Sequence, residues 1–291
     1  MLIYRNVNDA YNGLLEYVES NGVEEDSRNG KVLTVPHPVL ICIEAPYERV
    51  LFDQARRANP FFHLMEAQWM LEGRNDVAEM VKYNKRMAEF SDDGATFNGA
   101  YGYRWRHHFG YDQMTYAINE LAANPHSRRV VISMWDGAQD LTSESKDKPC
   151  NTSLMFRVVD GCLDMTSTNR SNDLVWGLCG ANAVHLTYLQ EYMAYTIGIP
   201  IGRWYHCTNN LHVYEHHWEL MRTPREPLIP YPAPKYSVGS QEFYNHTVGR
   251  ARHAWHLFKQ GEDARAMALA ESIHSPDWRL ACMNWLAGVA K

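Results

Sequence analysis

Cys150 is the residue of this chain whose type and setting best suit covalent chemistry. It follows Pro149 and precedes a run of alternating residues, TSLMFRVV, and the segment NRSND lies just beyond a second such run. A cysteine is a nucleophile only as its thiolate, so a catalytic cysteine needs a nearby cation that lowers its pKa. Arg170, in NRSND, is the candidate cation. The alternative for Cys150 taken alone is a buried, inert thiol.

Glu66 and the pair His212 and Tyr214 are further candidates. Glu66 lies among apolar residues of a predicted helix, where a carboxylate is costly unless it is paired or hydrated; its alternative is a place on the polar face. His212 and Tyr214 are two residues apart in LHVYEHH and would point the same way from a strand. A zinc site of His212, His216 and His217 is the rival interpretation, but no familiar ligand set is completed, so we predict no metal.

Two alternating runs must position Cys150 and Arg170. TSLMFRVV and CLDMTST are separated only by Asp160 and Gly161, a sequence typical of a two-residue β-hairpin turn. A further strand is predicted at VVISMW, and VLTVPHPVLICI, after the turn SRNGK, suits a strand broken by prolines. Several antiparallel strands are therefore expected.

Helical periodicity accounts for much of the remaining chain. In YDQMTYAINELAANP, Met114, Ile118 and Leu121 share one helical face, and Pro125 ends the helix. The other predicted helices cover residues 7–20, 60–90 and 182–197, with two or three more within 240–290. Strands and helices together predict a mixed α+β fold.

The domain organisation is predicted from length and from one proline-rich segment. The chain has 291 residues, enough for a large core, and shows no repeats. The segment LIPYPAPKYSVGSQ at 228–241 is the best candidate for a boundary. We therefore predict a catalytic core over residues 1–225 and a helical C-terminal extension of the same domain over residues 226–291.

Composition and charge argue against several classes of protein. The net charge of -6 and a pI near 6.2 argue against binding of nucleic acid, although a local arginine cluster can hold a small anion. No run of about 18 apolar residues could span a bilayer, and the N-terminus lacks the build of a signal peptide. The six cysteines include no CxxC pair, which indicates reduced thiols. We expect a cytoplasmic protein without membrane association.

The candidate residues fall in segments that resemble thymidylate synthases and the related pyrimidine-nucleotide hydroxymethylases. The stretch from PCNTSLMFRVV to NRSNDLVWG is similar to the family's nucleophile loop and its arginine-serine-x-aspartate segment. Further matches in family order are SRNGK, EAQWMLEG at 66–73, NGAYGYRWR at 98–106, NPHSRRVVISMW at 124–135 and LHVYEHH at 211–217. The resemblance covers roughly residues 10–220 and implies a thymidylate synthase-like fold, a mixed, mostly antiparallel sheet packed with helices.

The resemblance also implies a reaction. In this family a cysteine thiolate adds to carbon 6 of a pyrimidine nucleotide, and carbon 5 then becomes an enolate-like nucleophile that attacks a one-carbon donor. The implied substrate is a pyrimidine deoxynucleoside monophosphate, and the implied cofactor is 5,10-methylene-tetrahydrofolate. Cys150 is the matching nucleophile, with Arg170 near it.

Three more residues match catalytic positions of the family. Glu66 matches a glutamate that organises water for proton transfer at the base and the folate, a general acid–base role. Tyr101 matches a tyrosine that assists proton removal at carbon 5; its alternative is a core or hairpin tyrosine. Asp173 matches an aspartate that touches the pterin and the base; its alternative is a cap for the next segment. Glu66 and Asp173 are thus also the implied cofactor-binding residues.

The nucleotide's phosphate and sugar have matching residues as well. By resemblance, Arg28, Arg170 and Ser171 bind the phosphate, and His212 and Tyr214 hydrogen-bond the sugar 3′-hydroxyl.

Arg128 and Arg129 open a predicted apolar strand and match a pair that crosses to the other subunit and binds its phosphate. This match implies a homodimer with two shared active sites. The alternative is a solvated turn.

The sequence departs from the synthases where the product is decided. Asn151 follows the nucleophile in place of the usual histidine, and no tryptophan near Met87 or Ala88 shields the exocyclic methylene. The end ACMNWLAGVAK does not resemble the apolar tail that closes a synthase over its folate. Without such closure, water rather than a hydride captures the methylene. We therefore predict a hydroxymethylase that converts dUMP, methylene-tetrahydrofolate and water into 5-hydroxymethyl-dUMP and tetrahydrofolate.

The choice of base depends on the segment GLCGANAV. Synthases carry an asparagine that matches uracil there, whereas deoxycytidylate hydroxymethylases carry an aspartate suited to cytosine. With one inserted residue Asn182 takes this place, and without it Ala181 does; neither is an aspartate, so dUMP is the predicted substrate. The alternative for Asn182 is a helix cap. Thymidylate synthase, deoxycytidylate hydroxymethylase and a catalytically inactive nucleotide-binding protein remain alternative functions.

Overall fold

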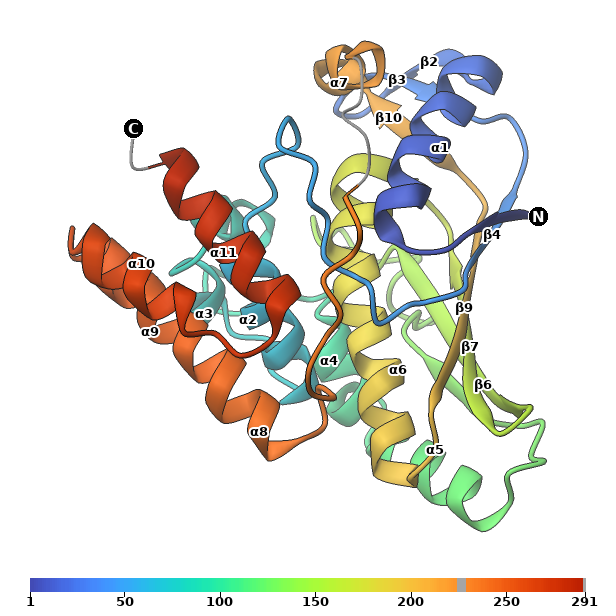
Figure 1. The fold of residues 1–291 in the computed structure, drawn as a ribbon. Coiled ribbons are helices and arrows are strands. Elements are labelled where there is room, and N and C mark those ends of the chain that lie inside the picture. The colour runs from blue at the N-terminus through green and yellow to red at the C-terminus, as the bar shows by residue number, and fades with distance from the viewer. Residues whose placement is uncertain (224–228, 290–291) are drawn as a thin grey trace.

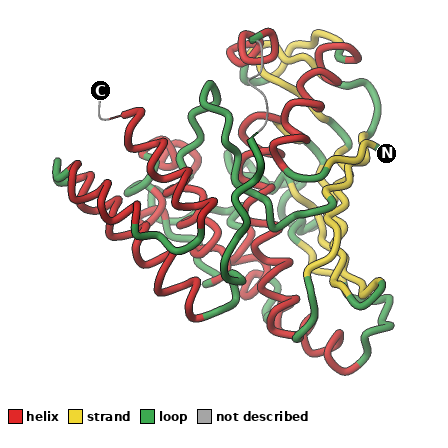
Figure 2. The backbone as a smooth tube through the Cα atoms, viewed as in Figure 1, coloured by secondary structure: helices red, strands yellow, loops and turns green. Residues whose placement is uncertain are grey.

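The computed structural model describes residues 1–223 and 229–289 and has the predicted α+β fold. Figure 1 shows the larger sheet on the right, with α6 (Ala183–Ile197) along one of its faces and the C-terminal helices as the outermost layer on the left. In Figure 2 the strands form the right-hand margin of the molecule, and helices lie on one side of them only. One face of the larger sheet is therefore without helical cover.

The larger sheet has six strands and contains the predicted hairpin. Its order is β1 (Leu2–Tyr4), β4 (Val39–Ile43), β9 (Ile201–Thr208), β7 (Cys162–Asn169), β6 (Asn151–Val159) and β5 (Val131–Ser133). Asp160 and Gly161 join β6 to β7 with φ angles of 50° and 77°, the left-handed conformation that this turn requires. The pairs β1–β4 and β7–β9 are parallel and the other three are antiparallel, so the sheet is mixed and mostly antiparallel as predicted.

A smaller sheet carries the predicted ligands of the sugar. Its order is β2 (Val23–Ser27), β3 (Gly30–Thr34), β10 (Leu211–Tyr214) and β8 (Asn172–Asp173). The segment VLTVPHPVLICI is thus broken more completely than predicted, because β3 belongs to this sheet and β4 to the larger one. Two prolines, which cannot donate to a strand ladder, separate the two strands.

The helices lie close to their predicted places, with two corrections. The described helices are α1 (Val7–Asn21), α2 (Pro60–Leu71), α3 (Val77–Met80), α4 (Tyr101–Tyr103), α5 (Gln113–Ala123), α6, α7 (Trp218–Arg222), α8 (Gln241–Phe243), α9 (Gly249–Lys259), α10 (Asp263–Glu271) and α11 (Pro276–Val289). Short π-helical segments continue α4 as Arg104–His108, precede α6 as Leu174–Asn182 and join α8 to α9 as Tyr244–Val248. Three-residue-per-turn helices cover Lys85–Phe90 and Glu215–His217.

The prediction of one helical stretch over residues 60–90 is wrong in its middle. Gly73, with φ of 72°, ends the helix begun at Pro60, and the side chains of Asp76 and Asn84 each start a new short helix as its cap. The helix predicted to begin at residue 182 begins earlier, at Leu174, because Asp173 caps it there.

The C-terminal helices pack directly on the core. The Trp255 ring lies 5.5 Å from that of Phe61 on α2, and the Trp285 ring lies 5.7 Å from the same phenylalanine. The predicted boundary at residue 225, like the start of LIPYPAPKYSVGSQ and the last two residues of the chain, lies outside the described residues. The division into core and extension therefore stays a prediction.

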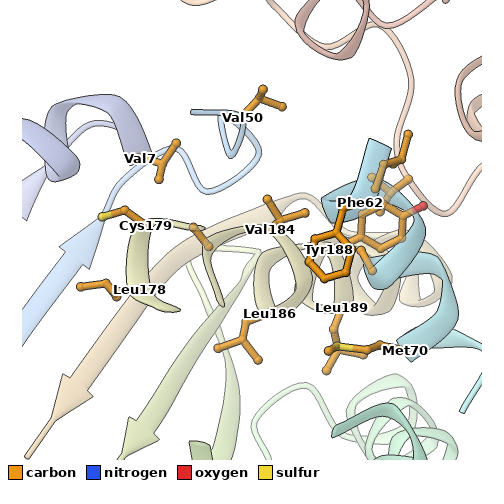
Figure 3. Packing of buried hydrophobic residues seen from close by; sticks show 14 of the residues in the cluster. Val7, Val50, Phe62, Met70, Leu178, Cys179, Val184, Leu186, Tyr188 and Leu189 are labelled. Atoms are coloured by element: carbon orange, nitrogen blue, oxygen red, sulfur yellow. The ribbon is translucent and has the colours of Figure 1, made fainter. Parts of the chain in front are cut away.

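The hydrophobic core is centred on α6, whose buried residues face several neighbours. Figure 3 shows Val184, Tyr188 and Leu189 of α6 with Phe62 and Met70 of α2. A helix that is apolar on most sides belongs in the interior, and this one separates α2 from the larger sheet. No helix in the described part of the chain is long and apolar enough to cross a membrane.

Candidate active site

Cys150 and Arg170 meet at the open end of the hairpin. The pairing of Asn151 with Asn169 brings the preceding and following residues together, and the Arg170 amide donates to the Cys150 carbonyl at 2.9 Å. The Arg170 guanidinium donates to the carbonyl of Pro149 at 2.8 Å, and its Nη2 lies 3.7 Å from the Cys150 Sγ. The hairpin thus holds the predicted cation beside the predicted nucleophile.

The charges around Cys150 act in opposite directions on its thiol. Burial raises the pKa of Cys150 above its ordinary value, while the positive charges of Arg170 and Arg28 lower it and Asp147 raises it. Arg28 comes from the β2–β3 turn, so two separate segments bring positive charge to the sulfur. Their effect is to make the thiolate less costly in a site that otherwise disfavours it.

Tyr101 binds the backbone at Cys150 and Asn151. Its hydroxyl oxygen accepts hydrogen bonds from the backbone amides of Cys150 and Asn151, each at 3.1 Å. Since a tyrosine hydroxyl accepts two bonds and donates one, its own hydrogen is left for another acceptor. Burial raises the pKa of Tyr101, so the hydroxyl stays protonated at neutral pH. Tyr101 is therefore more than a packing residue.

Glu66 is buried on α2, so the alternative of a surface carboxylate is wrong. It is 7% exposed, and its Oε2 lies 3.8 Å from the Nδ1 of His185 on α6. The His185 ring packs edge-on against the Tyr101 ring at 5.7 Å between centroids. His185 was not among the predicted site residues. Like Glu66, it is a polar residue among apolar neighbours of a helix, and this feature could have identified it from the sequence.

Asp173 performs the capping role considered for it. Its carboxylate oxygens accept hydrogen bonds from the amides of Val175 and Trp176 at 3.0 and 3.2 Å. It also lies opposite His212 in the β8–β10 pair. Burial raises the pKa of Asp173 and lowers that of His212, and each group partly offsets the shift of the other.

His212 and Tyr214 point the same way from a strand, as predicted. Their rings lie on the same side of β10, 5.0 Å apart. Among the described residues, no group of three or more histidine, cysteine, aspartate or glutamate side chains is placed to hold a metal ion.

Asn182 lies in a buried network of amides and makes no capping hydrogen bond, so the helix-cap alternative is wrong. Its Oδ1 accepts from Asn151 Nδ2 at 3.1 Å and from His185 Nε2 at 3.0 Å, and its Nδ2 donates to Asn172 Oδ1 at 3.2 Å. The preceding segment, Leu174–Asn182, is π-helical. A π-helical bulge is the form that an inserted residue takes in a helix, which favours Asn182 over Ala181 at the predicted position.

The predicted phosphate ligands fall into two groups. Arg170 and Ser171 follow β7 beside Cys150, and Arg28 lies within electrostatic reach of it. Arg128 and Arg129 are exposed and precede β5, whereas the site lies beyond the other end of that strand, where Trp135 stacks on Arg170 at 5.6 Å. The fold does not bring this pair to the Cys150 of its own chain.

Comparison with known proteins decides the family. The thymidylate synthase family model matches residues 9–249. A deoxyuridylate hydroxymethyltransferase of Pseudomonas phage M6 is 40% identical over 323 aligned positions, which cover 97% of this chain and 92% of that protein. The chain belongs to the thymidylate synthase family. It is accordingly a one-carbon transferase, and enzymes like thymidylate synthase use folate cofactors.

Two more distant relatives carry the same description. Deoxyuridylate hydroxymethyltransferases of Bacillus phage SP01 and Delftia phage PhiW-14 are 39% and 26% identical to this chain. The alignments cover 64% and 69% of this chain, and 51% and 58% of those proteins. The chain thus spans little more than half the length of these two relatives.

A cavity next to the site suits the folate of a thymidylate synthase family member. It has a volume of about 480 Å³ and lies between α11, the start of α2 and residues 50–58. Phe52, Trp278 and Trp285 give it flat aromatic walls, and Arg57 adds a positive charge. Size and lining are typical of a pocket for a small aromatic ligand.

This cavity adjoins the Glu66–His185 pair without containing it. Its lining includes His63, one turn before Glu66 on α2, and Val184, the residue before His185 on α6. Burial lowers the pKa of His63 to about 3, so its imidazole is neutral. Neither Glu66 nor Asp173, the predicted cofactor ligands, lines the cavity.

Arg56 is a further polar group that the sequence analysis did not single out. Its guanidinium stacks on Trp176 at 4.1 Å, and its Nε donates to the Val175 carbonyl at 2.9 Å. Its Nη2 is buried and has no hydrogen-bond partner among the described residues. A buried donor of this kind is costly unless it is satisfied, so Arg56 offers one N–H to a hydrogen-bond acceptor of a ligand within electrostatic reach of Asp173.

Proposed function

We infer that this protein is a deoxyuridylate hydroxymethylase, which uses 5,10-methylene-tetrahydrofolate and water to convert dUMP into 5-hydroxymethyl-dUMP. The observation that carries the assignment is the meeting of Cys150 and Arg170, with Nη2 3.7 Å from Sγ, in a chain 40% identical to a deoxyuridylate hydroxymethyltransferase. The relatives bear out the sequence prediction of a hydroxymethylase.

The residues of the site have distinct tasks in this reaction. Cys150 adds as a thiolate to carbon 6 of the base, and Arg170 stabilises the anion before addition and after release. The folate supplies the one-carbon unit. Tyr101, whose hydroxyl already accepts two backbone amides, keeps a hydrogen that can bond a base or water beside the nucleophile. Glu66, as a carboxylate, organises the water through which protons are transferred at the base, and Tyr101 assists removal of the proton from carbon 5.

Asn182 selects uracil through the direction of its amide. Its oxygen already accepts from Asn151 and His185, and one amide hydrogen goes to Asn172, so a single N–H remains for a ligand. A remaining donor matches the carbonyl oxygen at carbon 4 of uracil, whereas cytosine has an amino group there. The site of Asn182 therefore favours dUMP over dCMP.

The phosphate is bound by arginines of both subunits of a homodimer. Arg28, Arg170 and Ser171 act from the same chain, and Arg128 and Arg129 act on the site of the partner. The uncovered face of the larger sheet supports this arrangement, since it exposes the apolar side chains of Leu40, Val131 and Met155. His212 and Tyr214 bind the sugar.

The direct test is mass spectrometry of nucleotides incubated with the purified protein and methylene-tetrahydrofolate. We expect dUMP to gain one hydroxymethyl group, dCMP to stay unchanged, and Cys150→Ser to abolish the product. A gain of one methyl with dihydrofolate formation would instead identify a thymidylate synthase, and modified dCMP a deoxycytidylate hydroxymethylase. No product from either nucleotide, with binding of dUMP retained, would identify an inactive nucleotide-binding protein.

A further inference from the structure

His185 has a buried imidazole ring. Among the described residues, only one of its two nitrogens has a hydrogen-bond partner. The residue is 3% exposed, and its Nε2 lies 3.0 Å from Asn182 Oδ1. An amide oxygen only accepts hydrogen bonds, so Nε2 carries the hydrogen. In the neutral ring Nδ1 therefore has a lone pair, and it is buried without a hydrogen-bond partner among the described residues.

The Nδ1 atom of His185, itself a hydrogen-bond acceptor, faces a second acceptor, the carboxylate of Glu66. Glu66 Oε2 is 3.8 Å from His185 Nδ1, too far for a direct hydrogen bond and short enough to be bridged. A carboxylate oxygen and an imidazole lone pair both require a donor. Two hydrogen bonds of about 2.8 Å that meet at one water at the tetrahedral angle span about 4.5 Å, so a single water can donate to both atoms once they move apart by about 0.7 Å.

Contacts through Tyr101 link the position of such a water to Cys150. The His185 ring contacts the Tyr101 ring, and the Tyr101 hydroxyl contacts the amide of Cys150, the residue that holds the base through its sulfur. When both hydrogens of a water are donated to Glu66 and His185, its lone pairs point away from these two groups. This is the orientation that a nucleophilic water needs.

We propose that His185 and Glu66 together hold and activate the water whose oxygen becomes the hydroxyl of the product. The proposal rests on the proposed hydroxymethylase function and adds a catalytic residue to it.

The activated water adds to the exocyclic methylene of the base. The water oxygen forms a bond to the methylene carbon attached to carbon 5 of the Cys150-bound base, and one O–H bond breaks. The proton passes to His185 Nδ1, where the Glu66 carboxylate stabilises the imidazolium. The electron pair of the methylene double bond moves into the ring and forms the enolate. When the double bond between carbons 5 and 6 re-forms, Cys150 leaves as a thiolate, and His185 releases its proton to solvent.

Asn151 and Asn182 determine which nitrogen of His185 carries the hydrogen. Asn151 Nδ2 and His185 Nε2 both donate to Asn182 Oδ1, so the amide whose remaining N–H selects uracil also fixes, through its oxygen, the tautomer of His185. Base selection and water activation are thus joined through the side-chain amide of Asn182.

The test compares His185→Gln, Glu66→Gln and the double variant with the wild-type enzyme. Glutamine keeps an N–H donor for Asn182 but cannot take a proton at neutral pH. We expect H185Q to lower kcat about 100-fold, the lower end of general acid–base effects, while the Kd for dUMP stays within about threefold. If the pair acts in one step, the double variant should be no worse than the poorer single variant.

His108→Gln is the matched control, because His108 forms a histidine–carboxylate pair with Asp136 at 3.0 Å outside the site. It should keep wild-type kcat. A second measurement is ¹⁵N NMR of the His185 ring in the free protein, which should show a protonated Nε2 and an unprotonated Nδ1.

Two results would overturn the proposal: an H185Q enzyme with kcat within threefold of wild type, or an Nδ1-protonated ring. A wild-type protein that forms no hydroxymethyl product would refute the proposed function itself, so the two failures are distinguishable.

Discussion

The pKa of Cys150 should depend on Arg170, and Arg170→Gln tests this dependence. Arg170 Nη2 lies 3.7 Å from the Cys150 sulfur, and the positive charge of Arg170 lowers the thiol's pKa against the effect of burial. Glutamine removes the charge and keeps an N–H donor for the Pro149 carbonyl. The pKa of Cys150 should therefore rise.

The size of the shift follows from Coulomb's law. Two unit charges 3.7 Å apart interact by about 1 kcal/mol in a water-like dielectric and by about 4.5 kcal/mol at an effective dielectric constant of about 20. Arg170 is exposed, so the screened end of this range applies. About 1 kcal/mol corresponds to somewhat less than one pKa unit, and the thiolate fraction at neutral pH should fall roughly 5- to 10-fold.

The assay is the rate of alkylation of Cys150 by iodoacetamide as a function of pH in the nucleotide-free protein. A Cys150→Ser protein gives the background from the other cysteines, of which Cys162 and Cys207 are half-buried. R170Q should move the midpoint up by about one unit, and Arg170→Lys, which keeps the charge, by less. An unchanged midpoint in R170Q, or equal shifts in both variants, would refute the electrostatic reasoning.

Two further predictions concern the base and the dimer. Asn182→Asp removes the N–H that faces the base, so kcat/KM for dUMP should fall at least about tenfold, and the preference for dUMP over dCMP should narrow in the mass-spectrometric assay. An unchanged preference would show that another residue selects the base. Cys150→Ala and the double variant Arg128→Ala, Arg129→Ala should each be inactive, but subunits re-mixed from both should regain about a quarter of wild-type activity, because each heterodimer contains one complete site. Failure to regain activity, with heterodimers demonstrated by native mass spectrometry, would place the two arginines outside the partner's site.

The local parts of the fold could be predicted from sequence because their causes are local. Asp160 and Gly161 adopt the left-handed angles that a two-residue hairpin needs, and that turn sets the pairing that places Arg170 beside Cys150. The helix of Met114 and Leu121 was predicted from its apolar face. The prediction over residues 60–90 failed because Gly73 and two asparagine or aspartate caps interrupt a stretch that composition alone makes helical.

Sequence by itself thus determined the family and the likeness to a hydroxymethylase, and it predicted that Arg170 lies beside Cys150, since these depend on residue types at short and ordered spacings. Tertiary structure alone decided that Glu66 faces His185, that Asn182 is bound by Asn151 and Asn172 instead of capping a helix, and that Arg128 and Arg129 lie away from the Cys150 of their own chain. The physical reason is that the packing of α2 against α6 brings together side chains far apart in the chain. Periodicity and turn rules describe only residues that are close in the sequence. Only the packing of the two helices places the carboxylate of Glu66 near the Nδ1 of His185.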